Sequence, residues 1–125
     1  MFKVSCIQIC SGKDIKKNQK ITKKLVLKAI KQKSDFIITP ETSSLFGLNK
    51  KQLLKKATSM KKDYYLNGIR ELAKIYKKWI LTSVIIKEKN KLKNRSVLIN
   101  ANGAIQNYYD KIHMYDVVLS KKEKY

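Results

Sequence analysis

Two short and almost wholly apolar runs constrain the fold of this chain most. They are DFIIT at residues 35–39 and WILTSVII at residues 79–86. Runs of this length are typical of strands that are covered on both faces, because a half-exposed strand would alternate apolar and polar residues. Neither run approaches the roughly 20 apolar residues that a membrane-spanning helix needs. We therefore expect an internal sheet with further layers on its faces.

The segments that flank these runs predict helices. Asp14 is expected to cap a helix that extends to about Gln32, and Asp63 to cap a second helix over 63–78. In both positions a carboxylate can accept hydrogen bonds from the free amides of the first turn. A weaker helical pattern covers 50–57, so helices alternate with the apolar runs.

The remaining segments predict further strands. Residues 2–9 open the chain as a strand, and a lysine-rich turn is expected over 87–93. Strands at 96–101 and 104–109 are predicted to form a hairpin, because the Asn102-Gly103 pair between them favours a tight turn. The order of strand, helix, strand, helix, strand and hairpin indicates an α/β fold with helices packed on a sheet. A length of 125 residues fits one domain, 1–125.

The formal net charge of +20 has two interpretations. A strongly basic domain is typical of nucleic-acid binding, and such binding would weaken steeply as salt rises. However, Arg70 and Arg95 are the only arginines, and arginine is the residue suited to bidentate contacts with bases and phosphates. We therefore favour a solvated lysine-rich surface. A face that binds a polyanion, or an unrelated nucleic-acid-binding domain, is the alternative.

The two cysteines, Cys6 and Cys10, do not form a disulfide framework. Since no histidine lies near them, a metal site is not expected, and neither is a cofactor. The simplest prediction is that both are buried structural thiols. Lys3 interrupts the first apolar stretch and no cleavage site follows, so a signal peptide is not indicated and a cytoplasmic location is expected.

Glu41 is the first candidate for chemistry. It directly follows the apolar strand and Pro40, at the carboxyl end of a strand, where open α/β sheets place their ligand sites. Apolar surroundings would raise its pKa, which suits a general base. The alternative is a helix cap or a surface acid at the entrance of a loop.

Lys111 is the second candidate. It lies in YYDKIHMYD, where a half-buried ammonium could stabilise a developing oxyanion. His113, the sole histidine, is expected to be structural, although histidine as a residue type would also allow a switching role. Asp110 and Asp116 are expected to pair with lysines or to cap turns.

Taken together, these segments resemble the N-terminal half of the nitrilase superfamily of carbon–nitrogen hydrolases. The resemblance rests on five features in order, which are Gln8 with Asp14 and Asn18, then TPET at 39–42, Asn94-Arg95-Ser96, Asn102-Gly103, and YDKIHMYD at 109–116. The last segment is similar to the lysine motif of the superfamily. Its HMYD form is most similar to the amidase branches, which act on ω-amides or on amides like deaminated glutathione.

The resemblance implies a mechanism in which a cysteine attacks the amide carbon and forms a thioester. Glu41 would be the general base and acid, and Lys111 would stabilise the oxyanion, with Asn94, His113 and Asp116 in support. The nucleophilic cysteine of the superfamily follows the lysine motif by some tens of residues, and this chain ends at Tyr125. Cys6 and Cys10 do not match its position. We therefore expect the chain to be inactive alone.

The resemblance also implies a four-layer α-β-β-α sandwich, of which this chain is about the first half. A complete protein would hydrolyse a small amide and form homo-oligomers. Its remaining half would come from the rest of an interrupted gene or truncated sequence, or from a partner in a split enzyme. The alternative is a non-catalytic remnant that binds a partner subunit or a polyanion. No membrane association is expected.

Overall fold

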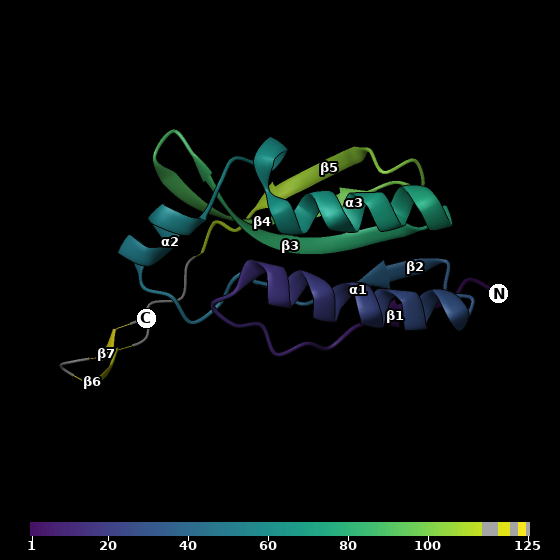
Figure 1. The fold of residues 1–125 in the computed structure, drawn as a ribbon, viewed down its shortest axis with the longest axis horizontal. Coiled ribbons are helices and arrows are strands. Elements are labelled where there is room, and N and C mark those ends of the chain that lie inside the picture. Colours follow the sequence, from purple (N-terminus) through teal and green to yellow (C-terminus); the bar gives the residue numbers. More distant parts are fainter. Residues whose placement is uncertain (114–117, 121–122, 125) are drawn as a thin grey trace.

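A five-stranded mixed sheet forms one layer of the fold (Figure 1). The computed structural model describes residues 1–113, 118–120 and 123–124. The strands lie side by side in sequence order, with β1, β2 and β3 parallel and with β4 and β5 antiparallel to their neighbours. Their bounds are Val4–Cys6 (β1), Phe36–Ile38 (β2), Trp79–Glu88 (β3), Lys91–Ile99 (β4) and Ile105–Asp110 (β5). A separate two-stranded ladder follows, made of Val118–Ser120 (β6) and Glu123–Lys124 (β7).

The helices begin at the residues that the capping pattern predicted. Asp14 accepts hydrogen bonds from the amides of Lys16 and Lys17, and Asp63 accepts from that of Leu66. The helices are α1 (Ile15–Lys31), α2 (Lys50–Lys56) and α3 (Tyr64–Tyr76), with a single 3-10 turn, η1, at Met60–Lys62. α2 begins with a capping box between Asn49 and Gln52. No helix in the described part of the chain is long and apolar enough to cross a membrane.

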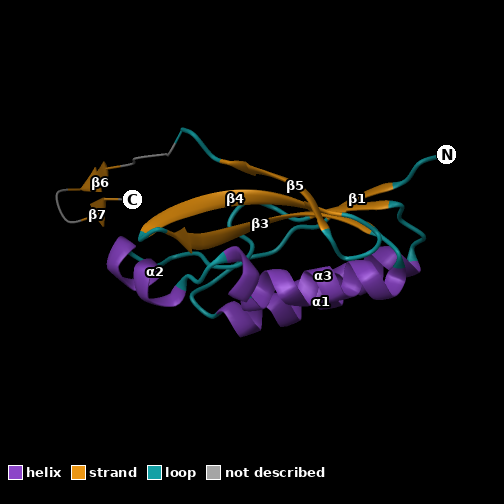
Figure 2. Ribbon diagram, turned by 90° about the horizontal axis from the view of Figure 1, so that it is seen from above, coloured by secondary structure: helices purple, strands orange, loops and turns teal. Residues whose placement is uncertain are grey.

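All of the helices lie on one face of the sheet (Figure 2). On β3 the alternate residues Ile80, Val84 and Ile86 are fully buried against this layer. They pack in one cluster with Val26 of α1 and with residues of α3 such as Ile69. Burial of aliphatic side chains of this size is worth roughly 1.5–3 kcal/mol each, so this cluster holds the two layers together.

The opposite face of the sheet is covered by no helix of the described chain (Figure 2). The side chains that alternate with the core positions point there, and Val4, Trp79 and Tyr109 remain 46%, 38% and 59% exposed. From the apolar runs of β2 and β3 we expected a covering layer on both faces of the sheet. Within the described residues only one face is covered. The fold is thus a layer of helices on one face of a mixed sheet, and no described helix covers the other face.

The loops differ from expectation in extent. The lysine-rich turn expected over 87–93 is only the Lys89-Asn90 pair, both with positive φ, and the ladder of β3 and β4 continues on each side of it. Charged residues reach into these strands because this end of the ladder projects beyond the core. The Asn102-Gly103 turn is confirmed, with Gly103 at φ +75°. The opening strand is shorter than 2–9, because β1 pairs with β2 only over residues 4–6.

Candidate active site

Glu41 lies in the loop that follows β2, as the sequence predicted. Buried hydroxyl groups tie the start of this loop to the sheet. The Oγ1 atoms of Thr39 and Thr82 lie 2.8 Å apart, and Ser43 Oγ donates to Thr39 Oγ1 at 3.0 Å. Thr42 adopts a left-handed conformation, with φ of 54°. This sharp reversal of the backbone lies directly after Glu41, at the end of the sheet where β2 stops.

The far end of the same loop is held from two sides. Ser44 Oγ accepts a hydrogen bond of 2.9 Å from the backbone amide of Ile85, in β3. The Asn18 side chain, near the start of α1, donates to the backbone carbonyl of Ser44 at 2.9 Å. Because Ser44 and Asn18 are both buried, the loop that carries Glu41 is anchored on the sheet and on the helix layer.

Asn94 of β4 holds the Glu41 carboxylate. Its Nδ2 atom donates to Glu41 Oε1 at 2.6 Å, and its Oδ1 atom accepts from Ser83 Oγ of β3 at 3.2 Å. The Glu41 carboxylate fixes which way the amide of Asn94 points, because an ionised carboxylate only accepts hydrogen bonds and so requires the Nδ2 side of the amide. Ser83 also accepts from the backbone amide of Thr42 at 3.3 Å.

Lys111 completes the group from the end of β5. Its backbone amide donates to the carbonyl of Asn94 at 2.9 Å. Its Nζ atom lies 2.8 Å from Glu41 Oε1, so the same carboxylate oxygen accepts from Lys111 and from Asn94. The two side chains of the ion pair are 36% and 56% exposed for Lys111 and Glu41. An ion pair this exposed contributes little stability, roughly 0–1 kcal/mol.

The electrostatic environment of Glu41 is the reverse of what was expected. The hydrogen bond from Lys111 lowers the pKa of Glu41 below its ordinary value of 4.5, desolvation opposes this, and Asn94 lowers the pKa further. The expectation of a raised pKa was wrong, because it considered the apolar strand before Glu41 and not the cation that reaches it from β5. Glu41 is therefore ionised at neutral pH.

A cavity of about 220 Å³ opens beside this group. It lies on the face of the sheet that no helix covers, and Leu81 and Tyr109 form its apolar part. Its lining residues are Thr39, Glu41, Leu81, Thr82, Ser83, Asn94, Ser96, Tyr109 and Lys111. A carboxylate and an ammonium thus border one small space, as a proton acceptor and a fixed positive charge.

His113 and the two cysteines lie outside this cavity. His113 is exposed and is not among the lining residues, and Asp116 lies outside the described residues. Cys6 and Cys10 are both exposed, so the prediction of buried thiols was wrong. The reason is that β1 is an edge strand, and Cys6 alternates with the core positions of that strand. Neither thiol lines the cavity.

Ser83 is the site residue that sequence reasoning missed. Its signal is a pair of polar residues, Thr82 and Ser83, inside the apolar run of β3. Both are buried, and a buried hydroxyl needs a partner. Asp110 was expected to pair with lysines, and it does contact Lys93 at 3.5 Å, but its shortest contact is with Arg95.

The sequence of this chain is similar to those of known proteins. The model of the carbon–nitrogen hydrolase family matches residues 3–125. The nitrilase and fragile histidine triad fusion protein NitFhit of Caenorhabditis elegans is 25% identical over 123 residues, 95% of this chain. The deaminated glutathione amidase of Yersinia enterocolitica is 26% identical over 118 residues, 91% of this chain.

Solved structures agree with the fold. The crystal structure of C. elegans NitFhit superimposes with a TM-score of 0.83 at 25% identity, over 100% of this chain and 32% of that one. An amidase from Nesterenkonia sp. gives 0.78 at 17% identity, over 91% and 44%. The chain covers only 28% of the NitFhit sequence and 41% of the deaminated glutathione amidase.

Proposed function

The chain belongs to the carbon–nitrogen hydrolase family, and on that premise we propose that it supplies two parts of an amide-hydrolysing site. Glu41 is the general base and acid, and Lys111 is the oxyanion stabiliser. The observation that carries this proposal is the convergence of Lys111 and Asn94 on one oxygen of Glu41, beside a cavity. Lys111, directly after β5, and Asn94 of β4 thus bring a cation and an amide donor to the same carboxylate oxygen.

The proposed reaction has two halves. A cysteine thiol attacks the amide carbon while Glu41 accepts the thiol proton, and Lys111 donates a hydrogen bond to the developing oxyanion. Glu41 then gives the proton to the departing nitrogen, the C–N bond breaks, and ammonia departs. The acyl group remains on the cysteine as a thioester. Water attacks the thioester with Glu41 as base, which releases the carboxylic acid and restores the thiol. The lowered pKa of Glu41 favours the ionised form that both attacks need.

The nucleophile is proposed to come from residues other than these 125. The two cysteines of the sequence are exposed, and neither is among the residues that line the cavity. The remaining half of a family subunit would carry the cysteine and would cover the open face of the sheet, where Val4, Trp79 and Tyr109 are exposed. It would arrive either in one longer polypeptide or as a partner chain, and the complete protein would form homo-oligomers.

A small amide is the proposed substrate. The cavity is small and combines hydroxyl groups with Leu81 and Tyr109, which suits an uncharged amide end. A relative named for deaminated glutathione supports a substrate of the amide class. The family match removes the alternative of an unrelated nucleic-acid-binding domain.

The test uses the chain completed with a carboxyl-terminal half, which we call the completed protein. That half is the continuation of the coding region or, where none exists, the corresponding half of the Yersinia relative. Ammonia release from small amides should fall by about 10²–10³ in Lys111→Ala. Cys6→Ser and Cys10→Ser are the controls and should keep the rate. Loss of activity in a folded Cys6→Ser protein would overturn the assignment of the nucleophile.

A non-catalytic remnant that binds a partner through the open face is the second candidate, because that face exposes Trp79 and Tyr109. It predicts that Trp79→Lys abolishes binding of the separate carboxyl-terminal half, while the assembled wild-type complex releases no ammonia. Turnover by that complex would exclude this candidate.

A further inference from the structure

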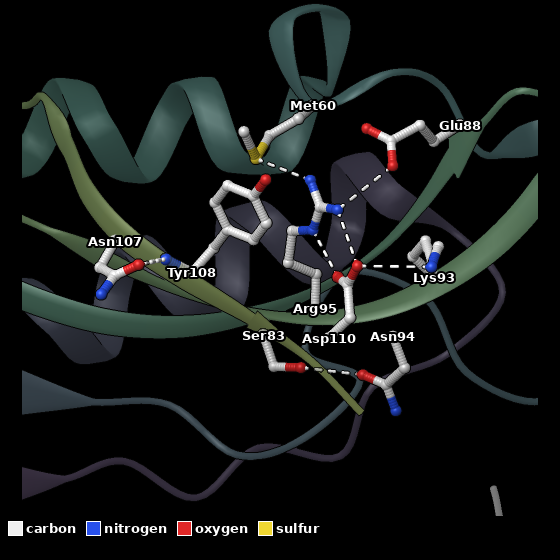
Figure 3. A network of polar contacts seen from close by, with 9 residues as sticks. All are labelled: Met60, Ser83, Glu88, Lys93, Asn94, Arg95, Asn107, Tyr108 and Asp110. Atoms are coloured by element: carbon white, nitrogen blue, oxygen red, sulfur yellow. Dashed lines mark hydrogen bonds and ion pairs between the residues drawn. The ribbon is translucent and has the colours of Figure 1, made fainter. Parts of the chain in front are cut away.

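Arg95 of β4 and Asp110 of β5 form a two-point ion pair on the face of the sheet that carries the helices (Figure 3). Arg95 Nε lies 2.5 Å from Asp110 Oδ1, and Arg95 Nη2 lies 2.9 Å from Asp110 Oδ2. This fork geometry fixes both the distance and the angle between the two side chains, which a lysine cannot do. The side chain of Arg95 is only 2% exposed.

Three further contacts fix the guanidinium of Arg95. Its Cζ atom stacks 3.9 Å from the centre of the Tyr108 ring. Its Nη1 atom lies 3.6 Å from Met60 Sδ, and its Nη2 atom lies 3.4 Å from Glu88 Oε2 (Figure 3). A side chain with partners on every side has one available position, so Arg95 is a rigid support for Asp110.

Each member of this pair is the neighbour in sequence of a site residue. Arg95 follows Asn94, and Asp110 precedes Lys111. Because successive side chains of a strand point to opposite faces, the ion pair lies on the helix face while Asn94 reaches Glu41 on the other face. Arg95 and Asp110 are directly opposite each other in the ladder, and the amide of Lys111 then donates to the carbonyl of Asn94.

The end of β5 is where such support is needed. Asp110 is the last residue of the strand, and the backbone bond from Lys111 is the next contact along the chain. Strand ends open readily when few contacts hold them. A shift of β5 by one residue would also move Lys111 to the other face of the sheet.

We propose that Arg95 and Asp110 are positioning residues, which lock the end of β5 against β4 and thereby hold Lys111 and Asn94 on Glu41. The inference rests on the proposed function, because it assigns a role to the pair through the two residues of that site. Neither Arg95 nor Asp110 lines the cavity, so they act through their neighbours.

The experiment is an NMR titration of the Glu41 carboxyl group in the 125-residue chain. Arg95→Gln/Asp110→Asn removes the ion pair and leaves the net charge unchanged, so a change at Glu41 reports position and not long-range charge. Asp110→Asn alone is the milder variant, because its amide oxygen still accepts from Arg95. Lys93→Gln, which removes the exposed cation beside Asp110, is the matched control for the loss of charge near the site.

The proposal predicts that the pKa of Glu41 rises toward 4.5 in the double variant and part of the way in Asp110→Asn, while both variants stay folded and Lys93→Gln keeps the wild-type value. A wild-type value in a folded double variant would overturn it. So would unfolding of Asp110→Asn, because the pair would then support the whole domain. An ordinary pKa of Glu41 in the wild-type chain would instead count against the site and the proposed function.

Discussion

Glu41 Oε1 accepts a hydrogen bond of 2.8 Å from Lys111 Nζ, although 70 positions separate the two residues in the sequence. The same oxygen accepts at 2.6 Å from Asn94, which is 53 positions away. No single helix or hairpin spans such separations. The contact exists because β2 pairs with β3, β3 with β4 and β4 with β5. This order of strands brings Glu41, Asn94 and Lys111 together.

Removal of Lys111 should raise the pKa of Glu41. The hydrogen bond from Lys111 is the largest cause of the lowered pKa, so Lys111→Met should bring the value back toward 4.5. NMR titration of the carboxyl carbon measures it. Lys23→Met is the control, because it removes a cation that pairs with Glu71 in the helix layer. Equal values in Lys111→Met and wild type would show that the two groups do not meet in solution.

Asp110 should make the fold sensitive to acid. Its pKa is lowered below 3.8, chiefly by the hydrogen bond from Arg95, so the folded chain binds fewer protons than the unfolded one. The resulting stability is complete above pH 3.8 and is lost as the pH falls through the folded pKa. In urea unfolding between pH 6 and pH 2.5, Asp110→Asn should therefore lose less stability on acidification than wild type. An equal loss of stability on acidification in Asp110→Asn and in wild type would contradict this role of Asp110.

Asp63 should behave in the opposite way. Desolvation raises its pKa above 3.8, and among the described residues its Oδ2 atom has no partner, while Oδ1 caps α3. Ionisation of the buried Asp63 carboxyl group lowers the stability of the fold. This loss of stability is absent at low pH and grows as the pH rises toward the folded pKa. Asp63→Ala should cost about 1 kcal/mol through loss of the cap. Asp63→Asn keeps an acceptor and should cost less at pH 7. A larger loss in the asparagine variant would contradict this account of Asp63.

The Asn102-Gly103 turn should not tolerate a side chain. Gly103 has φ of +75°, and a Cβ atom there would lie 2.7 Å from the backbone oxygen of Arg70. Gly103→Ala should therefore destabilise the chain by about 1–3 kcal/mol in urea unfolding. Gly12→Ala is the matched control, because the nearest atom to its Cβ would be Asn18 Oδ1 at 4.0 Å. If both variants lost similar amounts of stability, the conformation of the Asn102-Gly103 turn would not be the cause of the loss in Gly103→Ala.

Local signals were enough to predict much of the fold. Asp14 and Asp63 each cap a helix, and Asn102-Gly103 forms a turn, because each depends on residues close in sequence. The position of Glu41 at a strand end was predictable for the same reason. What failed depended on tertiary neighbours. The pKa of Glu41 follows from a distant lysine, and the exposure of Cys6 follows from the edge position of β1.

Lys111 could not be chosen from its local sequence properties alone. In a lysine-rich chain no local property distinguishes this residue from the others, and only the motif around it did so. In the structure the backbone amide of Lys111 donates to the carbonyl of Asn94 and its side chain reaches Glu41, contacts that no local property of the sequence predicts. Ser83 had a weaker signal, as a polar residue in an apolar strand.

Glu41 is proposed here as the general base and acid of an amide hydrolase. This role is tested most directly by the rate of ammonia release from a small amide by the completed protein, wild type against Glu41→Gln at equal folded content. Glutamine keeps the size of the side chain and an acceptor for Asn94 and Lys111, but it cannot take up a proton. Wild type should release ammonia, and Glu41→Gln should not. Turnover by a folded Glu41→Gln protein at the wild-type rate would contradict it.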